Sequence, residues 1–121
     1  MIAEATTVRE RELYRLQAEL CRTLADPTRL ELLHLLGEGE KAVKQLVEGT
    51  GQRQANISQH LALLREQGVV QGRRVGTEVH YTLVDPRILD ACRVTRALLL
   101  ARLSRSAALL DLAEVTIPGE D

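Results

Sequence analysis

The sequence predicts a mostly α-helical fold with one β-hairpin, in the order α-α-α-α-β-β-α. Apolar residues recur at i, i+3 and i+4 over several segments, as on the buried faces of helices. After Gly68 the apolar period changes to two, as in strands. The chain of 121 residues is 45% hydrophobic but only 2% aromatic, so its core must consist of aliphatic side chains, as in small helical proteins. We expect a single domain over residues 1–121.

The first two helices are predicted from a leucine stripe and a helix-start signal. Residues 8–24 carry Leu13, Leu16, Leu20 and Leu24 on one face. Asp26 and Pro27 then supply an N-cap and a first-turn proline for a second helix over residues 28–36.

A helix-turn-helix is predicted over residues 42–66. Its first helix, residues 42–47, places three apolar side chains at i, i+3 and i+4, and residues 49–51, Gly-Thr-Gly, should stop it. The second helix, residues 54–65, buries Ile57, Leu61 and Leu64 at the same spacing. Ala42 and Arg53 stand where hydroxyl residues commonly cap such helices, a loss of roughly 1 kcal/mol each that loosens a helix end without forbidding the fold.

A β-hairpin wing is predicted over residues 69–83. Gly68 suits the left-handed position that ends a helix. Residues 79, 81 and 83 are apolar and alternate with polar residues at 78, 80 and 82, so one strand face is apolar and the other wet. The basic segment 73–77 is expected to form the turn between the two strands.

The last helix is predicted to follow Asp85 and Pro86, which repeat the earlier helix-start signal, and to run to about residue 113. A near-heptad apolar stripe follows it, formed by Leu89, Cys92, Leu99, Leu103 and Leu110. A single subunit offers no second layer to cover this stripe. Residues 8–24 and 85–113 are therefore expected to form a homodimer interface, the alternative being packing within one subunit.

The second helix of the helix-turn-helix carries polar side chains suited to reading DNA. Amides bond adenine in bidentate fashion, hydroxyls bond several bases, and the major groove, about 12 Å wide, admits a helix. The candidate DNA-binding residues are Gln54, Asn56, Ser58, Gln59, His60, Arg65, Arg73 and Arg74. Residues 53–80 hold four Arg and two Glu in a chain of net charge −1, so the positive charge is local. The alternatives are a solvated surface helix and a solubilising hairpin tip.

The chain resembles the ArsR/SmtB family of winged helix-turn-helix repressors. The resemblance is carried by residues 20–30 (LCRTLADPTRL), 56–61 (NISQHL) and 68–70 (GVV). It implies a dimeric, sequence-specific transcriptional repressor that binds double-stranded operator DNA and is released by a small inducer, such as a metal ion or a thiol-reactive species.

The sensing site is not identified by the family's metal motifs. Metal sensors of the family use a cysteine pair in the helix before the recognition helix, and residues 41–46 here contain neither thiol nor imidazole. Asp90 and Cys92 match only the first half of a second family site on the last helix. We therefore assign no metal site. No cofactor is expected, except that binding of a transition metal ion stays an open alternative.

The two cysteines, Cys21 and Cys92, are the candidate sensing thiols. They lie on the two helices expected to dimerise, so they could form a disulfide, a persulfide link or half of a thiolate metal site. The alternative is that both are small buried hydrophobic residues. The three histidines occupy three different elements and do not form a cluster by spacing.

Other classes of function lack their sequence signatures. An enzyme would need a base and an orienting group around a nucleophile, and the sequence shows no phosphate-binding Gly-rich loop and no thiol beside a histidine. The open alternatives are a metal-responsive repressor with a non-standard site and a winged-helix protein-interaction module. With no N-terminal signal and no apolar run of about 20 residues, we expect a cytoplasmic protein without membrane contact.

Overall fold

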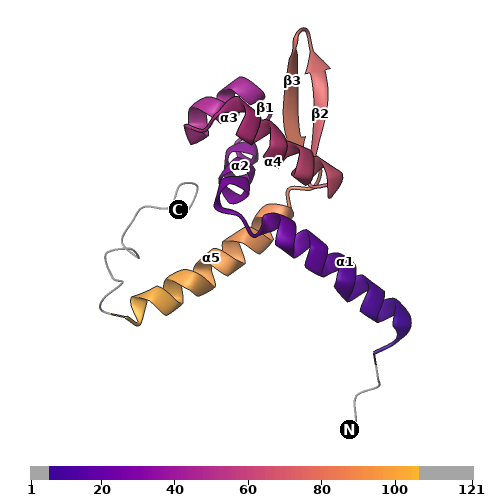
Figure 1. The fold of residues 1–121 in the computed structure, drawn as a ribbon. Coiled ribbons are helices and arrows are strands. Elements are labelled where there is room, and N and C mark those ends of the chain that lie inside the picture. The colour runs from indigo at the N-terminus through magenta and orange to yellow at the C-terminus, as the bar shows by residue number, and fades with distance from the viewer. Residues whose placement is uncertain (1–5, 107–121) are drawn as a thin grey trace.

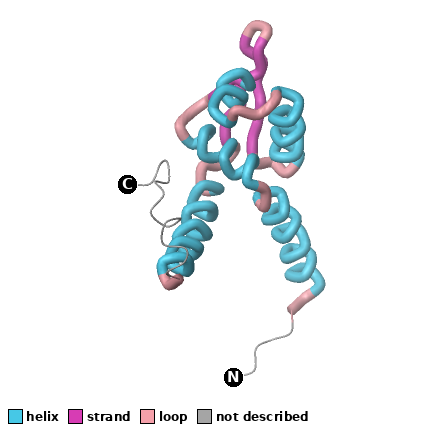
Figure 2. Tube along the Cα trace, turned by 60° about the vertical axis from the view of Figure 1, so that its left-hand side comes forward, coloured by secondary structure: helices cyan, strands magenta, loops and turns pink. Residues whose placement is uncertain are grey.

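The computed structural model describes residues 6–106. Its helices and strands are α1 (Val8–Leu24), α2 (Pro27–Gly37), β1 (Lys41–Ala42), α3 (Val43–Thr50), α4 (Gln54–Glu66), β2 (Val70–Val75), β3 (Glu78–Leu83) and α5 (Ile88–Ser104). Residues 27–83 form a head, and α1 and α5 project from it in different directions (Figure 1, Figure 2). The β2–β3 hairpin stands at the opposite end of the head. The predicted winged helix-turn-helix fold is confirmed.

The first two helices begin where the sequence predicts. Thr7 caps α1 in a reciprocal capping box, in which its hydroxyl accepts from the backbone of Glu10 and the Glu10 carboxylate accepts from the backbone of Thr7. Asp26 caps α2, because its Oδ2 accepts from the Arg29 backbone N–H at 3.0 Å, and Pro27 follows in the first turn.

The core is aliphatic and lies within the head. Fully buried side chains come from each helix of the head and from the start of the wing: Leu32, Leu33, Leu46, Ile57, Leu61, Leu64 and Val70. Tyr81 of β3 closes this cluster, and Leu20, Leu24, Leu89 and Cys92 pack against it from α1 and α5. Each fully buried Leu or Ile contributes about 1.5–3 kcal/mol, so the head is the stable part of the described chain.

Helix α3 is longer than the sequence predicts. It runs to Thr50, and only Gly51, at φ 70°, ends it. The expected stop at residues 49–51 is therefore wrong for Gly49, which lies inside the helix. A Cβ at Gly49 would lie 2.9 Å from Cδ1 of Leu35, so this glycine permits close packing of α3 on α2. As predicted, neither Ala42 nor Arg53 forms a side-chain cap bond.

The sheet has a third strand that the sequence analysis missed. Strand β1 pairs antiparallel with β3, with Lys41 opposite Tyr81 and Ala42 opposite His80, giving the order β1-β3-β2. Two residues carry too short a pattern to reveal a strand. This strand attaches the wing to the segment between α2 and α3.

The turn of the wing lies further along the chain than predicted. Strand β2 continues through Arg73 and Arg74 to Val75, so the expected turn at residues 73–77 is wrong. The turn consists of Gly76 and Thr77, with Gly76 at φ 64° in the first central position, as two-residue hairpin turns with glycine there require. The two arginines therefore lie within a strand and point to opposite faces of the sheet.

The last helix differs from its predicted bounds at both ends. Its N-cap residue is Arg87, whose backbone N–H bonds Oδ1 of Asp85 at 2.9 Å, so Asp85 stabilises a turn ahead of the helix instead of capping it. The helix ends at Ser104, with Arg105 as C-cap. The predicted helix over residues 107–113, including Leu110, lies outside the described residues.

The predicted stripe is open on the outer part of α1, where Leu13 is 62% exposed. On α5 the prediction is wrong in part, because Leu103 is buried and Leu89 and Cys92 pack against the core, while Leu99 is 44% exposed. The more exposed apolar residues of α5, Val94 and Leu98, lie outside the predicted stripe. The parts of both helices nearest the head pack on the core instead, and Leu89 sits within 2.8 Å of where a Cβ of Gly37 would be. The projecting parts of α1 and α5 thus keep apolar side chains exposed to solvent.

Gly68 provides a test of the junction between α4 and the wing. It lies at φ 73°, the Val69 N–H bonds the Leu64 carbonyl at 2.9 Å, and the Gly68 N–H bonds the Arg65 carbonyl at 3.0 Å, which is a Schellman motif. Gly68→Ala should lower the unfolding free energy by about 1 kcal/mol, because L residues resist this backbone region. Gly68→Asn is the matched control and should lose less, since Asn adopts this conformation more readily.

Urea denaturation at one fixed protomer concentration measures both losses. A Cβ at Gly68 would meet no other atom within 4 Å, so any loss reports the backbone alone. Unchanged stability of Gly68→Ala would contradict the assignment.

Candidate DNA-binding surface

Helix α4 buries three apolar side chains and exposes several of its polar ones. Ile57, Leu61 and Leu64 are completely buried against the core. Four of the predicted DNA-binding side chains are exposed to solvent: Gln54, Ser58, Gln59 and Arg65. The buried triplet therefore fixes the rotation of α4 about its axis and presents the amides and the hydroxyl outward.

Asn56 is engaged inside the protein. Its side-chain amide donates to Oε1 of Gln52, and Nε2 of Gln52 donates to Oγ1 of Thr28 at 2.6 Å. The chain of bonds ties the turn between α3 and α4 to the first turn of α2. Sequence periodicity could not reveal this role, because Gln52 lies in a turn and Thr28 lies 24 residues away.

His60 is also turned toward the protein. Its side chain is 16% exposed, and its Nδ1 lies 3.2 Å from Nη1 of Arg29 and 3.9 Å from Oδ2 of Asp26. The Arg29 contact is the hydrogen bond, because it is the shorter and a guanidinium can only donate. His60 thus faces the start of α2 and departs from the open side on which the sequence analysis placed it.

Arg73 is held by an acidic residue that the sequence analysis missed. Its Nε and Nη2 donate to the two carboxylate oxygens of Glu40, both at 3.0 Å, which raises the pKa of Arg73 and lowers that of Glu40. His80, directly across the wing from Arg73, places Nδ1 at 3.3 Å from Glu40 and Nε2 at 3.2 Å from Glu78. Glu40, just before β1, therefore contacts both wing strands, through Arg73 of β2 and His80 of β3.

Three other arginines leave positive charge on the head and the wing. Arg74 pairs in register with Val79 and so points to the face of the wing opposite Arg73. Among residues 6–106, Arg53, Arg65 and Arg74 form no ion pair. Their charges flank the exposed face of α4 at its start, at its end and on the wing.

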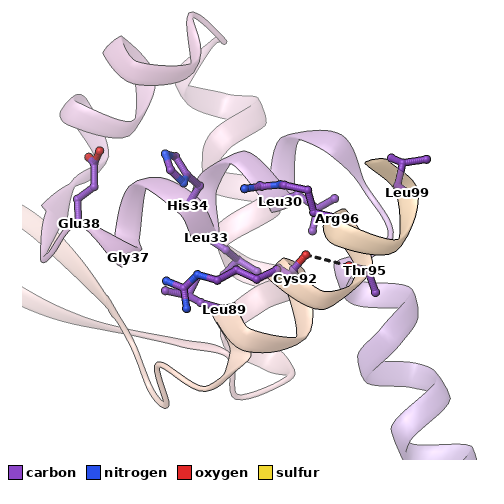
Figure 3. Close-up of a pocket in the computed structure, with 11 residues that line it drawn as sticks. Leu30, Leu33, His34, Gly37, Glu38, Leu89, Cys92, Thr95, Arg96 and Leu99 are labelled. Carbon is purple, nitrogen blue, oxygen red and sulfur yellow. Dashed lines mark hydrogen bonds between the residues drawn. The ribbon is translucent and has the colours of Figure 1, made fainter. Parts of the chain in front are cut away.

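The two cysteines lie in different environments. Cys21 is exposed on α1, so the interpretation that both cysteines are buried hydrophobic residues is wrong for this one. Cys92 is half-buried and lines a cavity of about 420 Å³ between α2 and α5. Figure 3 shows Leu33 and His34 of α2 on one side of this cavity and Cys92 on the other.

Burial raises the pKa of the Cys92 thiol, against the opposing influence of the charges of Arg96 and Arg93. At neutral pH this thiol is accordingly less ionised than an ordinary one. Within residues 6–106, no group of three or more His, Cys, Asp and Glu side chains is arranged to hold a metal ion. The cysteines are free thiols.

The fold and the exposed face of α4 define a winged helix-turn-helix DNA-binding protein. Residues 26–71 match the family described as bacterial regulatory protein, arsR family. The match runs from the N-cap of α2 through both helices of the helix-turn-helix to the second residue of β2.

Relatives match over most of the chain. The uncharacterized HTH-type transcriptional regulator Rv0081 of Mycobacterium tuberculosis is 39% identical over 100 residues, covering 82% of this chain and 88% of that protein. Its crystal structure has a TM-score of 0.70 over 77% of this chain and 94% of that chain. A probable mercury resistance operon repressor of Streptomyces lividans is 40% identical over 103 residues, covering 85% of this chain and 78% of that protein.

A homodimeric structure is similar as well. The solution structure of the homodimeric winged helix-turn-helix DNA-binding domain of Mb0332 from Mycobacterium bovis is 26% identical, with a TM-score of 0.72, and covers 88% of this chain and 97% of that chain. The chain therefore belongs to the ArsR family and is a DNA-binding transcriptional regulator.

Proposed function

We propose that this regulator is a repressor in which α4 reads operator bases and an inducer releases the DNA. The observation that carries the proposal is that α4 is anchored by three buried apolar side chains and leaves two glutamines and a serine exposed to solvent. Amides and hydroxyls at base edges supply the sequence specificity of a recognition helix. A protein-interaction module would not need such a face beside unpaired arginines.

The predicted DNA-binding residues divide into reading and positioning roles. Gln54, Ser58 and Gln59 are free to reach bases. Asn56 is bonded to Gln52, and His60 is bonded to Arg29, so these two side chains hold α4 and the turn before it in place. On the DNA they contact phosphates and not bases.

The arginines supply the contacts that do not depend on base sequence. Arg65 and Arg74 contact phosphates or the minor groove, because neither forms an ion pair within the described residues and both charges are free to meet DNA. Arg73 is largely neutralised by Glu40, so its main role is to set the angle of the wing against the head. The wing and the recognition helix then contact the DNA as one rigid unit.

The two projecting helices build the dimer. Residues 8–24 and 85–113 form its interface and the whole chain, residues 1–121, works as one domain. Support comes from the open leucines of α1 and α5. Two-fold symmetry then presents two recognition helices to two half-sites.

A pair of variants tests the division between base readers and phosphate contacts. Gln59→Ala should weaken operator binding by roughly 1–3 kcal/mol and leave nonspecific binding intact, because it removes a base contact. Arg74→Ala should weaken binding to all sequences alike and lower the salt slope by about 1. Fluorescence anisotropy against salt concentration measures both, with Gln71→Ala on β2 as the matched control.

The assignment fails if the folded Gln59→Ala and Arg74→Ala proteins both keep the full operator affinity of the wild type. It also fails if Gln71→Ala produces the same loss as Gln59→Ala, since that would show sensitivity to any amide on the head.

The inducer is proposed to be a soft, thiol-directed species that acts at Cys21 and Cys92. The cysteines lie on α1 and α5, the two helices of the proposed dimer layer, and Cys92 lines a cavity that reaches α2. The Streptomyces lividans relative is described as a repressor of a mercury resistance operon, and mercury is a metal that binds thiolates. A ligand there would shift the helices that set the separation of the reading heads.

Inducer release should depend on the thiols. With wild-type protein, we expect mercury(II) or an oxidant to dissociate the operator complex, and a reductant to restore it. The Cys21→Ser/Cys92→Ser variant should stay bound under all three conditions. A mobility shift assay reads the result, and equal release of the two proteins would return both cysteines to structural roles.

The cellular setting follows from the DNA target. We propose that the protein acts in the cytoplasm and has no catalytic activity of its own. No helix in the described part of the chain combines the length and apolar character needed to cross a membrane.

A further inference from the structure

Arg29 connects three helices through separate atoms. Its backbone N–H donates to the Asp26 carboxylate that caps α2, at 3.0 Å. Its Nε donates to the backbone carbonyl of Thr23 in the last turn of α1, at 2.5 Å, and its Nη1 donates to Nδ1 of His60 on α4, at 3.2 Å. One side chain therefore bridges a projecting helix and the recognition helix.

The Thr23 carbonyl is a specific anchor for a guanidinium. The last carbonyls of a helix have no partner within the helix and carry the negative end of its dipole. The Ala25 N–H bonds the carbonyl of Arg22 and so leaves that of Thr23 open. A charged donor at this carbonyl forms a stronger bond than a neutral donor would.

Helix α1 has few other attachments to the head. It contains no buried residue, and of its side chains only Leu20 and Leu24 pack against the core. A cavity of about 260 Å³ lies between its last turn and the end of α4, lined by Glu19, Arg22, Thr23, Arg29, Leu63 and Gln67. Apolar packing is therefore interrupted where Arg29 crosses between the two helices, while the rest of α1 projects from the head (Figure 1).

The contact with His60 holds the orientation of the ring. Arg29 can only donate, so Nδ1 is the acceptor of this hydrogen bond. Asp26, at 3.9 Å from the same Nδ1, flanks the ring from the start of α2. His60 is one residue from Gln59, so fixing this ring fixes the part of α4 that carries a proposed base reader.

We propose that Arg29 is a positioning residue that couples α1 to the recognition helix and thereby sets the separation of the two reading heads in the dimer. The inference rests on the proposed function, in which α1 dimerises and α4 reads bases. A rotation of α1 at the dimer interface is transmitted to α4 through Thr23, Arg29 and His60. The separation of the recognition helices must match the repeat of the groove, so this coupling determines which half-site spacing is bound.

Half-site spacing is the readout that distinguishes coupling from simple stabilisation. The DNA is the site that the wild-type protein recovers from the region upstream of its own gene, rebuilt with one or two base pairs added or removed between half-sites. Arg29→Lys keeps the charge but loses the planar fork that reaches Thr23 and His60 together. Arg22→Lys, in the last turn of α1 next to Thr23, is the matched control.

We expect the wild type and Arg22→Lys to prefer one spacing. Arg29→Lys should lose about tenfold of that preference, as for loss of one charged hydrogen bond, and should bind a single half-site within about twofold of wild type. An unchanged spacing profile in folded Arg29→Lys overturns the proposal. A uniform loss at every spacing and at the single half-site also overturns it, because that is the signature of a merely structural residue.

A second measurement needs no DNA and separates failure of this proposal from failure of the proposed function. A spin label is attached at Glu66→Cys in a Cys21→Ser/Cys92→Ser background. Pulsed electron paramagnetic resonance then measures the distance between the labels on the two α4 helices of the dimer. We expect one narrow distance distribution, broadened by Arg29→Lys and not by Arg22→Lys. Equal widths in the three proteins overturn the coupling, whereas a wild type that binds no operator refutes the proposed function alone.

Discussion

The burial of one face of α4 is the constraint on which the rest of the structure depends. Ile57, Leu61 and Leu64 are completely removed from solvent against α2, α3 and the start of the wing. Turning α4 by even half a helical turn would expose these side chains and bury amides without partners, which is costly in both respects. The exposed glutamines and serine therefore owe their orientation to aliphatic packing. The specificity for bases that we propose is in this sense a property of the core.

Side-chain hydrogen bonds add to this packing outside the apolar core. Gln52 and Asn56 hold the turn of the helix-turn-helix to α2, Glu40 clasps the wing, and Arg29 joins α1 to α4. Each of these connects segments that are distant in sequence or separated by a turn. Beyond them, α1 and α5 keep apolar side chains exposed, and this is the surface that we propose for a second subunit. That arrangement allows a change between subunits to reach the reading face without unfolding the head.

Local patterns predicted the helices well and the contacts between elements poorly. The caps at Asp26 and Gly68, and the buried triplet of α4, follow from short-range spacing, so the sequence contains them directly. Strand β1 cannot be predicted from spacing because two residues have no period, and the basic residues at 73 and 74 do not distinguish a strand from a turn. The sequence predicts that Asn56 and His60 contact DNA, because the spacing within α4 does not reveal their partners, Gln52 and Arg29, which lie outside this helix. The sequence identifies Cys21 and Cys92 as candidate thiols, but it does not show that one is exposed and the other half-buried, since this depends on how α1 and α5 project from the head.

The central claim is that two copies of α4, related by two-fold symmetry, insert their exposed faces into the major groove. Methylation interference tests it most directly, because guanine N7 lies in that groove and carries the added methyl group there. We expect interference in two windows on one face of the duplex, about 10 base pairs apart, with the same pattern in each half. Interference confined to one window, or modification of adenine N3 in the minor groove as the only effect, would contradict the account.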